Sequence, residues 1–256
     1  MNTQIWLSGS GRGMENEENF FPDFEMPRTP EEIAAGFDAA EQTSVSAKCL
    51  FRLGTGAYVP PSEMPTKFYH SARHRHFDAK MPAAFGTPYL LFQPSAIALM
   101  QQFDLGNAYF LPVRLYQNDR ETPIDMDVAT ICIGNTKETV RQDMTERLKI
   151  TRREGVKRLP VMPDDDVIVT RADAVSGVDL WCDPKIVNAW FMSDRLAQAL
   201  IAAGLKDAFE LVRTRTVEGV PSLSEAVSAS PRHNPIAELF RHLTRSSSNA
   251  SRRLRR

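Results

Sequence analysis

The spacing of apolar and polar positions along this chain alternates between the period of a strand and that of a helix. The clearest such alternation lies around residue 190. Ala189–Met192 is a short apolar run of the kind found in buried strands. Ser193 predicts a helix start directly after it, because a serine side chain accepts hydrogen bonds from the first free backbone N–H groups. Gly204 predicts the end of that helix, and a period-two pattern from Phe209 predicts another strand. The apolar face of the helix consists of Leu196, Ala199, Leu200 and Ala203.

The same order of patterns occurs about 100 residues earlier, in Pro88–Tyr116. Tyr89–Phe92 predicts a strand, Pro94 a helix start and Tyr109–Tyr116 a second strand. A shift of 100 residues also places Leu111 on Leu211. We therefore predict an α+β fold with two related strand–helix–strand units, at about residues 86–118 and 177–217. The units are expected to share one core, because neither buries its apolar face alone.

Weaker patterns predict the remaining elements. Asn135–Glu138 resembles a capping box, so a helix is expected after it with Val140, Met144 and Leu148 on its buried side and Lys137 on its solvated side. Thr29 with Pro30 predicts another helix start. Val59–Thr66, with its prolines, predicts a loop. Strands are expected in Gln4–Ser8, Cys49–Tyr58, Asp125–Gly134 and Val167–Thr170.

The composition changes after Val220, so we expect residues 1–220 to form a single domain. Residues 221–256 are predicted to be a Ser/Ala/Pro-rich linker, a short amphipathic helix and a mobile, basic Ser/Arg-rich tail. From Arg232 to the end there are seven arginines against Glu238 alone, whereas Met1–Ser44 holds nine acids against Arg12 and Arg28. The net charge is only −1, so the charge as a whole selects neither a membrane nor a nucleic acid as partner.

The three cysteines are far apart and odd in number, which argues against a disulfide framework. We therefore expect a reduced, cytoplasmic setting. The start of the chain lacks the pattern of a signal peptide, and no apolar run approaches the length of a membrane-spanning helix.

The candidate ligands for a metal ion are His70, His74 and His76, which lie close together in the sequence. Arg73 and Arg75 between them would repel a divalent cation, so a solvated loop is the favoured interpretation and no cofactor is expected. The chain shows no Gly-x-Ser-x-Gly or His-Glu-x-x-His motif, and we name no catalytic residue.

Two groups of carboxylates are candidates for binding a basic partner. Asp164, Asp165 and Asp166 are adjacent and costly to bury, which predicts a solvated turn before a strand. Such a turn is also able to bind a cation or to imitate phosphate toward a basic protein. Glu15, Glu17 and Glu18 follow a glycine-rich stretch near the start of the chain.

Gly177–Val212, here called the signature segment, resembles the characteristic region of family eleven of the bacterial polymorphic-toxin immunity proteins. The resemblance is carried by an aromatic-Asp-Pro turn, an apolar pair before Ser-Asp, and a small-residue helix that ends in Ala-Gly-Leu. Pro88–Tyr116 is a fainter copy of this region. The matching positions are Asp183, Pro184, Phe191, Ser193, Leu196, Leu200, Gly204 and Leu205.

The resemblance implies a protein of effector–immunity systems, such as those of type VI secretion, that binds and inhibits a cognate secreted toxin. We expect the signature residues to build the fold, and Asp164–Asp166 with Glu15, Glu17 and Glu18 to meet the toxin. Two alternatives remain: a metal-dependent hydrolase that uses His70, His74 and His76, and a nucleic-acid adaptor that uses the basic tail.

Overall fold

The computed structural model describes residues 4–9, 20–22, 48–70, 81–85, 89–151, 153–160 and 163–218. Several predicted features lie outside these ranges. They are the three acids near the start, the helix expected from Thr29, two of the three clustered histidines, and residues 221–256 with the linker, amphipathic helix and basic tail.

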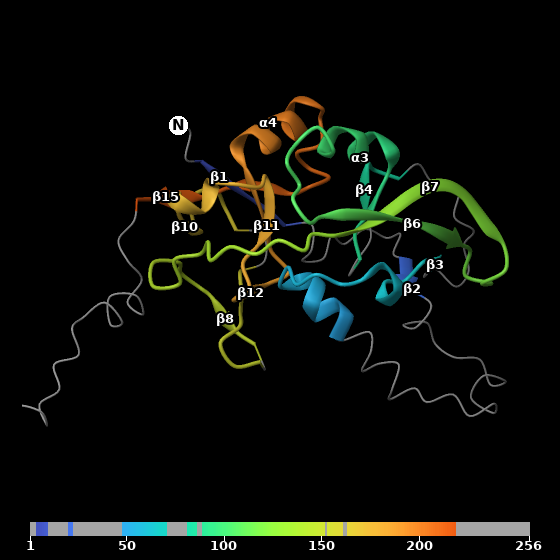
Figure 1. Ribbon diagram of the computed structural model, residues 1–256, viewed down its shortest axis with the longest axis horizontal. Helices are drawn as coiled ribbons and strands as arrows, with labels where there is room; N and C mark the ends of the chain where they lie inside the picture. The colour runs from blue at the N-terminus through green and yellow to red at the C-terminus, as the bar shows by residue number, and fades with distance from the viewer. Residues whose placement is uncertain are drawn as a thin grey trace, which may run out of the picture. The chain divides into compact units, whose positions relative to one another are not determined.

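The described residues form a mixed α+β structure in which strands predominate (Figure 1). Its helices are residues 48–54, α3 (Pro94–Met100), α4 (Asp194–Ala202) and the 3-10 turns η2 (Pro61–Glu63) and η3 (Ala172–Val175). The α+β class expected from the sequence is therefore correct.

One sheet of the described part is built around the signature segment, in the order β11–β13–β1–β14. Its strands are β11 (Leu180–Cys182), β13 (Trp190–Ser193), β1 (Ile5–Ser8) and β14 (Leu211–Arg213). β1 pairs antiparallel with both β13 and β14, which therefore run parallel to each other on either side of it. The predicted first strand thus lies inside this sheet.

Apolar side chains cover both faces of this sheet. Trp181 and Phe191 face a cluster that also includes Ile5 and Leu7. Their neighbours along the strands, such as Met192, face a second cluster that includes side chains of α3 and α4. Burial on both faces explains why β13 is an apolar run without alternating polar positions.

A second sheet has the order β2–β3–β6–β7–β5–β4 within the described ranges. Its strands are β2 (Phe20–Pro22), β3 (Lys67–His70), β6 (Tyr109–Tyr116), β7 (Pro123–Cys132), β5 (Leu91–Phe92) and β4 (Ala84–Phe85). β7 pairs antiparallel with both β5 and β6, so these two strands run parallel with β7 between them. This arrangement matches that of β13, β1 and β14.

Short strands extend the structure beside the signature segment. β10 (Val169–Arg171) pairs parallel with β15 (Arg215–Val217). β12 (Ile186–Val187), β9 (Lys157–Arg158) and β8 (Lys149–Ile150) form a small sheet in that order. β8 and β9 make a hairpin whose turn includes Arg153.

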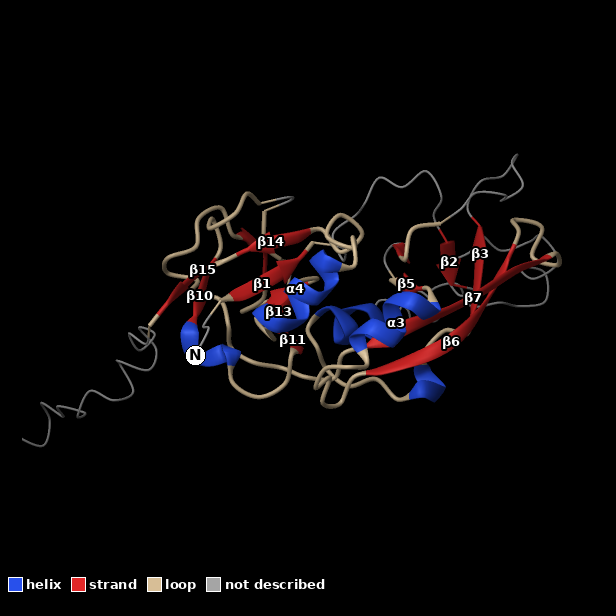
Figure 2. Ribbon diagram, turned by 90° about the horizontal axis from the view of Figure 1, so that it is seen from above, coloured by secondary structure: helices blue, strands red, loops and turns tan. Residues whose placement is uncertain are grey.

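α3 and α4 lie side by side in Figure 1 and in Figure 2, and they contact each other. Met100 of α3 and Leu200 of α4 belong to the same buried cluster. Phe92 connects the two sheets in this cluster, since its ring stacks on Trp190 with centroids 6.0 Å apart and lies 5.6 Å from Phe209.

The strand expected over Cys49–Tyr58 is wrong, because residues 48–54 are helical. Cys49 is buried, and Leu50 and Leu53 pack beside it against the cluster behind β3 and β6. Their spacing of three to four residues suits a helix face better than a strand. The Thr55 hydroxyl, which donates to the Phe51 carbonyl at 2.8 Å, lies at the end of this helix.

The helix expected after Asn135 is also wrong, since residues 139–148 form turns and irregular chain with one isolated bridge, at Val140. Asn135 does not cap a helix. Its side-chain amide donates to the carbonyls of Leu105 (2.7 Å) and Leu180 (3.0 Å), and its side-chain oxygen accepts from the Asn107 N–H (2.9 Å). Because the Asn135 side chain makes its hydrogen bonds with these distant backbone groups, it is not available to cap a helix.

None of the helices in the described ranges has both the length and the apolar character that crossing a membrane would require.

Candidate functional site

The acidic turn Asp164–Asp166 lies between the buried Pro163 and strand β10, and all three of its side chains are exposed. The Val167 N–H donates to the Asp164 carbonyl at 3.4 Å. Asp166 has a φ of +64°, a left-handed conformation that aspartate tolerates better than most residues. The turn predicted from the sequence is therefore present, and it presents its carboxylates to solvent.

Arg213 of β14 holds this turn in place. Its guanidinium makes two hydrogen bonds to the Asp166 carboxylate, at 2.6 and 3.1 Å. Its backbone N–H donates to the Asp165 carboxylate at 2.7 Å, and its carbonyl accepts from the Asp166 N–H at 2.8 Å. The hydrogen bonds with Asp166 raise the pKa of Arg213.

This pairing changes the charge that the turn offers to a partner. Arg213 offsets one of the three negative charges, and Asp164 alone of the three has no hydrogen-bond partner for its carboxylate in the described part of the chain. The sequence did not point to Arg213, because the period-two pattern places it on the same side of the strand as Phe209 and Leu211. No sequence signal indicated that its side chain meets the acidic turn.

The other candidate residues do not gather at this turn. Glu15, Glu17 and Glu18 lie outside the described residues, as do His74 and His76.

His70 is described, and it is not in the solvated loop that we expected. It ends β3 and is fully buried. Its ring centroid lies 5.4 Å from that of Phe20, which packs from the neighbouring strand β2. Among the described residues, no three His, Cys, Asp or Glu side chains are grouped so as to hold a metal ion.

The Asp183-Pro184 turn of the signature segment makes long-range hydrogen bonds that the sequence did not predict. One oxygen of the Asp183 carboxylate accepts the N–H groups of Thr139 and Val140, both at 2.8 Å, and the other accepts that of Lys185 at 2.9 Å. Asp183 is 2% exposed, and this burial raises its pKa. Asp183 therefore connects its own turn to the segment after Asn135, which the sequence predicted to be a helix.

Asp179 is the second buried carboxylate of the signature segment. The Arg195 guanidinium and the Ser193 hydroxyl donate to it at 2.5 Å, and the Asp104 N–H donates at 2.9 Å. Burial by itself raises the pKa of Asp179, but the hydrogen bonds from Arg195, Ser193 and Asp104 outweigh it and hold the pKa below its ordinary value. Ser193 also accepts from the Leu196 N–H at 3.4 Å, as expected of a helix cap.

Lys137 lies over Trp181 rather than on the solvated helix face predicted for it. Its ammonium group is 3.7 Å from the centre of the indole ring. It donates to the carbonyls of Ala174, Ser176 and Val178 at 2.9 to 3.0 Å. Burial lowers the pKa of Lys137 to about 8. The side chain therefore connects η3 with the start of β11.

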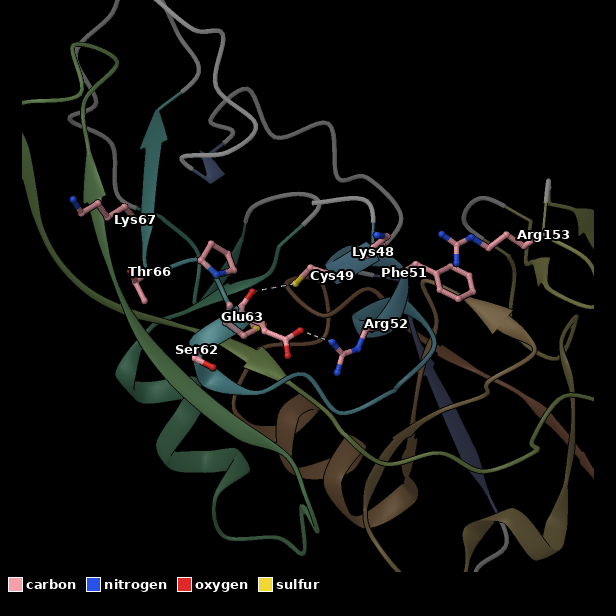
Figure 3. Close-up of a pocket in the computed structure, with 11 residues that line it drawn as sticks. Lys48, Cys49, Phe51, Arg52, Ser62, Glu63, Thr66, Lys67 and Arg153 are labelled. Carbon is pink, nitrogen blue, oxygen red and sulfur yellow. Dashed lines mark hydrogen bonds and ion pairs between the residues drawn. The ribbon is translucent and has the colours of Figure 1, made fainter. Parts of the chain in front are cut away.

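A pocket of about 830 Å³ lies beside the helix of residues 48–54 (Figure 3). Residues of that helix, of the η2 region and of the start of β3 line it, and Arg153 of the β8–β9 hairpin completes the wall. In Figure 3 the Arg153 guanidinium lies against the Phe51 ring, 3.6 Å from its centre. No local sequence pattern indicates this pocket, because its basic side chains come from segments up to about 100 residues apart.

Comparison with protein-family models and with curated proteins gives no match to this chain.

Proposed function

We propose that this protein is an immunity protein, which binds a cognate secreted bacterial toxin and neutralises it by covering the toxin's active or binding surface. The observation that carries the proposal is the exposed acidic turn, which Arg213 holds to strand β14. Arg213 directly follows the signature segment whose sequence resembles the immunity family. A fixed, exposed group of carboxylates is suited to recognising a basic protein surface.

The signature residues support a role in building this surface rather than in chemistry. Phe191 is fully buried, Ser193 caps the start of α4, and Asp183 accepts three backbone hydrogen bonds. These interactions fix the sheet on which the acidic turn is mounted. We accordingly propose a binding function without a catalytic centre, exercised in the cytoplasm.

We further propose that the two strand–helix–strand segments are structurally equivalent. β5 and β6 run parallel with β7 between them, just as β13 and β14 run parallel with β1 between them. α3 begins at Pro94 and α4 at Asp194, so the shift of 100 residues also superimposes the helix starts. Residues 1–220 would then be one domain built on two such units.

The hydrolase alternative gains nothing from His70, because its ring packs against Phe20 in the interior. The adaptor alternative depends on the basic tail, which lies outside the described residues.

Co-expression with the toxin encoded by the neighbouring reading frame tests the proposal. The protein should restore growth of cells that make the toxin, and the two proteins should purify together. Growth arrest that the protein does not relieve, with no complex on purification, would rule out the immunity role for that toxin.

Association kinetics with the same toxin test the part played by the acidic turn. Replacing all three aspartates by asparagine should slow association about tenfold at low salt and flatten its salt dependence, since opposite charges accelerate docking. Arg213→Gln should have the opposite effect, because it leaves the turn more negative while keeping the backbone hydrogen bonds. Asp207→Asn, at an exposed site elsewhere, is the matched control. Equal rates for all variants would mean that the toxin binds another surface.

A further inference from the structure

The pocket beside the helix of residues 48–54 has an excess of positive charge. Four basic side chains line it, against the single carboxylate of Glu63. The basic residues are Lys48, Arg52, Lys67 and Arg153. Like charges gathered in a concavity repel one another, and they attract anions from solution.

The carboxylate in this pocket neutralises only Arg52. The Arg52 guanidinium donates to Glu63 at 2.5 Å and, through its other terminal nitrogen, to the Tyr58 carbonyl at 2.6 Å. These two contacts fix the orientation of Arg52 at the pocket wall. Figure 3 shows the Glu63 side chain directed toward Arg52.

The other three cations have no carboxylate partner among the described residues. Lys48 and Lys67 are exposed, and Arg153 contacts the face of Phe51 instead. Contact with an aromatic ring leaves the N–H groups at the edge of a guanidinium available as donors. The hydroxyls of Ser62 and Thr66, which also line the pocket, add neutral donors.

The pocket is of a size typical for small-molecule ligands, since about 830 Å³ falls inside the usual range of roughly 300–1,000 Å³. Its walls come from a helix, a 3-10 turn, the start of a strand and a hairpin, so several sides of a ligand would be contacted. Concave walls of this kind favour a compact ligand over an extended chain.

We propose that this pocket binds a compact polyanion, a small molecule that carries phosphate groups or several carboxylates. Lys48 and Arg153 supply its charged contacts, and the two hydroxyls supply further hydrogen bonds. This site is independent of the immunity role, and it lies on segments other than the acidic turn.

Isothermal titration calorimetry on the purified full-length protein tests the site, with inorganic tripolyphosphate and citrate as probes at low salt. Saturable one-to-one binding of either probe is expected, and it should weaken as salt is added. Tighter binding of tripolyphosphate would assign phosphate as the recognised group, and tighter binding of citrate would assign carboxylates. The measurement uses no toxin, so its result and that of the growth assay are independent.

Single substitutions then locate the binding. Lys48→Gln and Arg153→Gln should each weaken it about tenfold, because each removes a charge-assisted hydrogen bond. Glu63→Gln should strengthen it about threefold, since it removes the negative charge from the pocket. Lys206→Gln, at an exposed lysine away from the pocket, should leave it unchanged. Thermal melting of each variant checks that it is folded.

The proposal is overturned if neither probe binds, or if Lys206→Gln weakens binding as much as the pocket variants do. It is also overturned if Glu63→Gln weakens binding while the protein stays folded. A hexaglutamate peptide serves as the contrasting ligand. Pocket-dependent binding of the peptide without binding of either small probe would show that the pocket recognises a protein segment instead.

Discussion

Two buried aspartates of the signature segment are stabilised in different ways. Asp179 is paired with the Arg195 guanidinium, whose side chain is 64% exposed. Asp183 has no cationic hydrogen-bond partner among the described residues and is held by three backbone N–H groups. Burial of a carboxylate is costly without hydrogen-bond partners. A guanidinium offsets this cost for Asp179, and backbone N–H groups offset it for Asp183.

The pairing of Asp179 predicts how stability depends on pH. Its pKa in the folded protein lies below the ordinary 3.8, so its contribution is complete above that value and is lost as the pH falls through the folded pKa. Asp179→Asn should therefore lower the free energy of unfolding at about pH 7, and lower it less at about pH 2.5. Urea denaturation of both proteins at the two pH values measures the difference.

Asp207→Asn provides the control for this experiment, because Asp207 is exposed. It should change the free energy of unfolding by less than about 0.5 kcal/mol at either pH. An equal loss for Asp179→Asn at both pH values would show that the charge of Asp179 contributes nothing to stability.

At the scale of elements, the local sequence pattern predicted correctly the segments whose backbone hydrogen bonds lie within the segment itself. α4 begins after Ser193 as predicted, and Gly204 follows its last turn with a φ of +73°. α3 begins at Pro94, also as predicted. A helix satisfies most of its backbone internally, so its start and end signals are readable from sequence.

The segment after Asn135 shows the opposite case. Its apolar spacing fits a helix, but Asp183 accepts the N–H groups of Thr139 and Val140, and Thr139 accepts from the Arg171 N–H. These partners lie more than 30 residues away in the sequence. Their hydrogen bonds replace those of a helix, and a local pattern carries no information about them.

Asp183→Ala should therefore loosen this segment. Two buried N–H groups would lose their acceptor, at a cost of about 1–3 kcal/mol each. Hydrogen exchange at Thr139 and Val140 should accelerate strongly relative to the rest of the core.

Asp183→Asn is the matched variant, because a single side-chain oxygen is able to accept both of these bonds. It should preserve most of the protection at Thr139 and Val140. Unchanged exchange in Asp183→Ala would show that other groups satisfy these amides.

At the scale of the whole domain, the four-stranded and six-stranded sheets depend on each other through one shared cluster. Phe92 from β5 packs on Trp190 from β13 and on Phe209 just before β14, while α3 and α4 pack together. Truncating either half would expose the apolar face of the other. The expectation that two segments share a core is consistent with this packing, whereas their structural equivalence remains our proposal.

This shared cluster predicts a single cooperative unfolding transition. The three tryptophans, Trp6, Trp181 and Trp190, all lie in the sheet of the signature segment, so their fluorescence reports on that sheet. Far-UV circular dichroism reports on all elements. The two signals should give the same urea midpoint, as expected for a two-state domain. Separate midpoints would show that the sheets unfold independently.

The candidate site was predictable only in part. The sequence showed that Asp164, Asp165 and Asp166 lie at the surface, because three adjacent carboxylates are costly to bury. It did not show that Arg213 pairs with them, nor that His70 is buried against Phe20. The basic pocket was not visible either, since Lys48 and Arg153 are brought together only by folding.

The sequence by itself determined the α+β class, the helices α3 and α4, the apolar strands around them and the exposed acidic turn. Each of these follows from hydrogen bonds and burial within a short stretch of chain. The tertiary structure decided the central place of β1, the turns after Asn135, and the partners of Asp183, Lys137 and Arg213. These features depend on contacts between residues far apart in the chain, and such contacts leave no periodic pattern in the sequence.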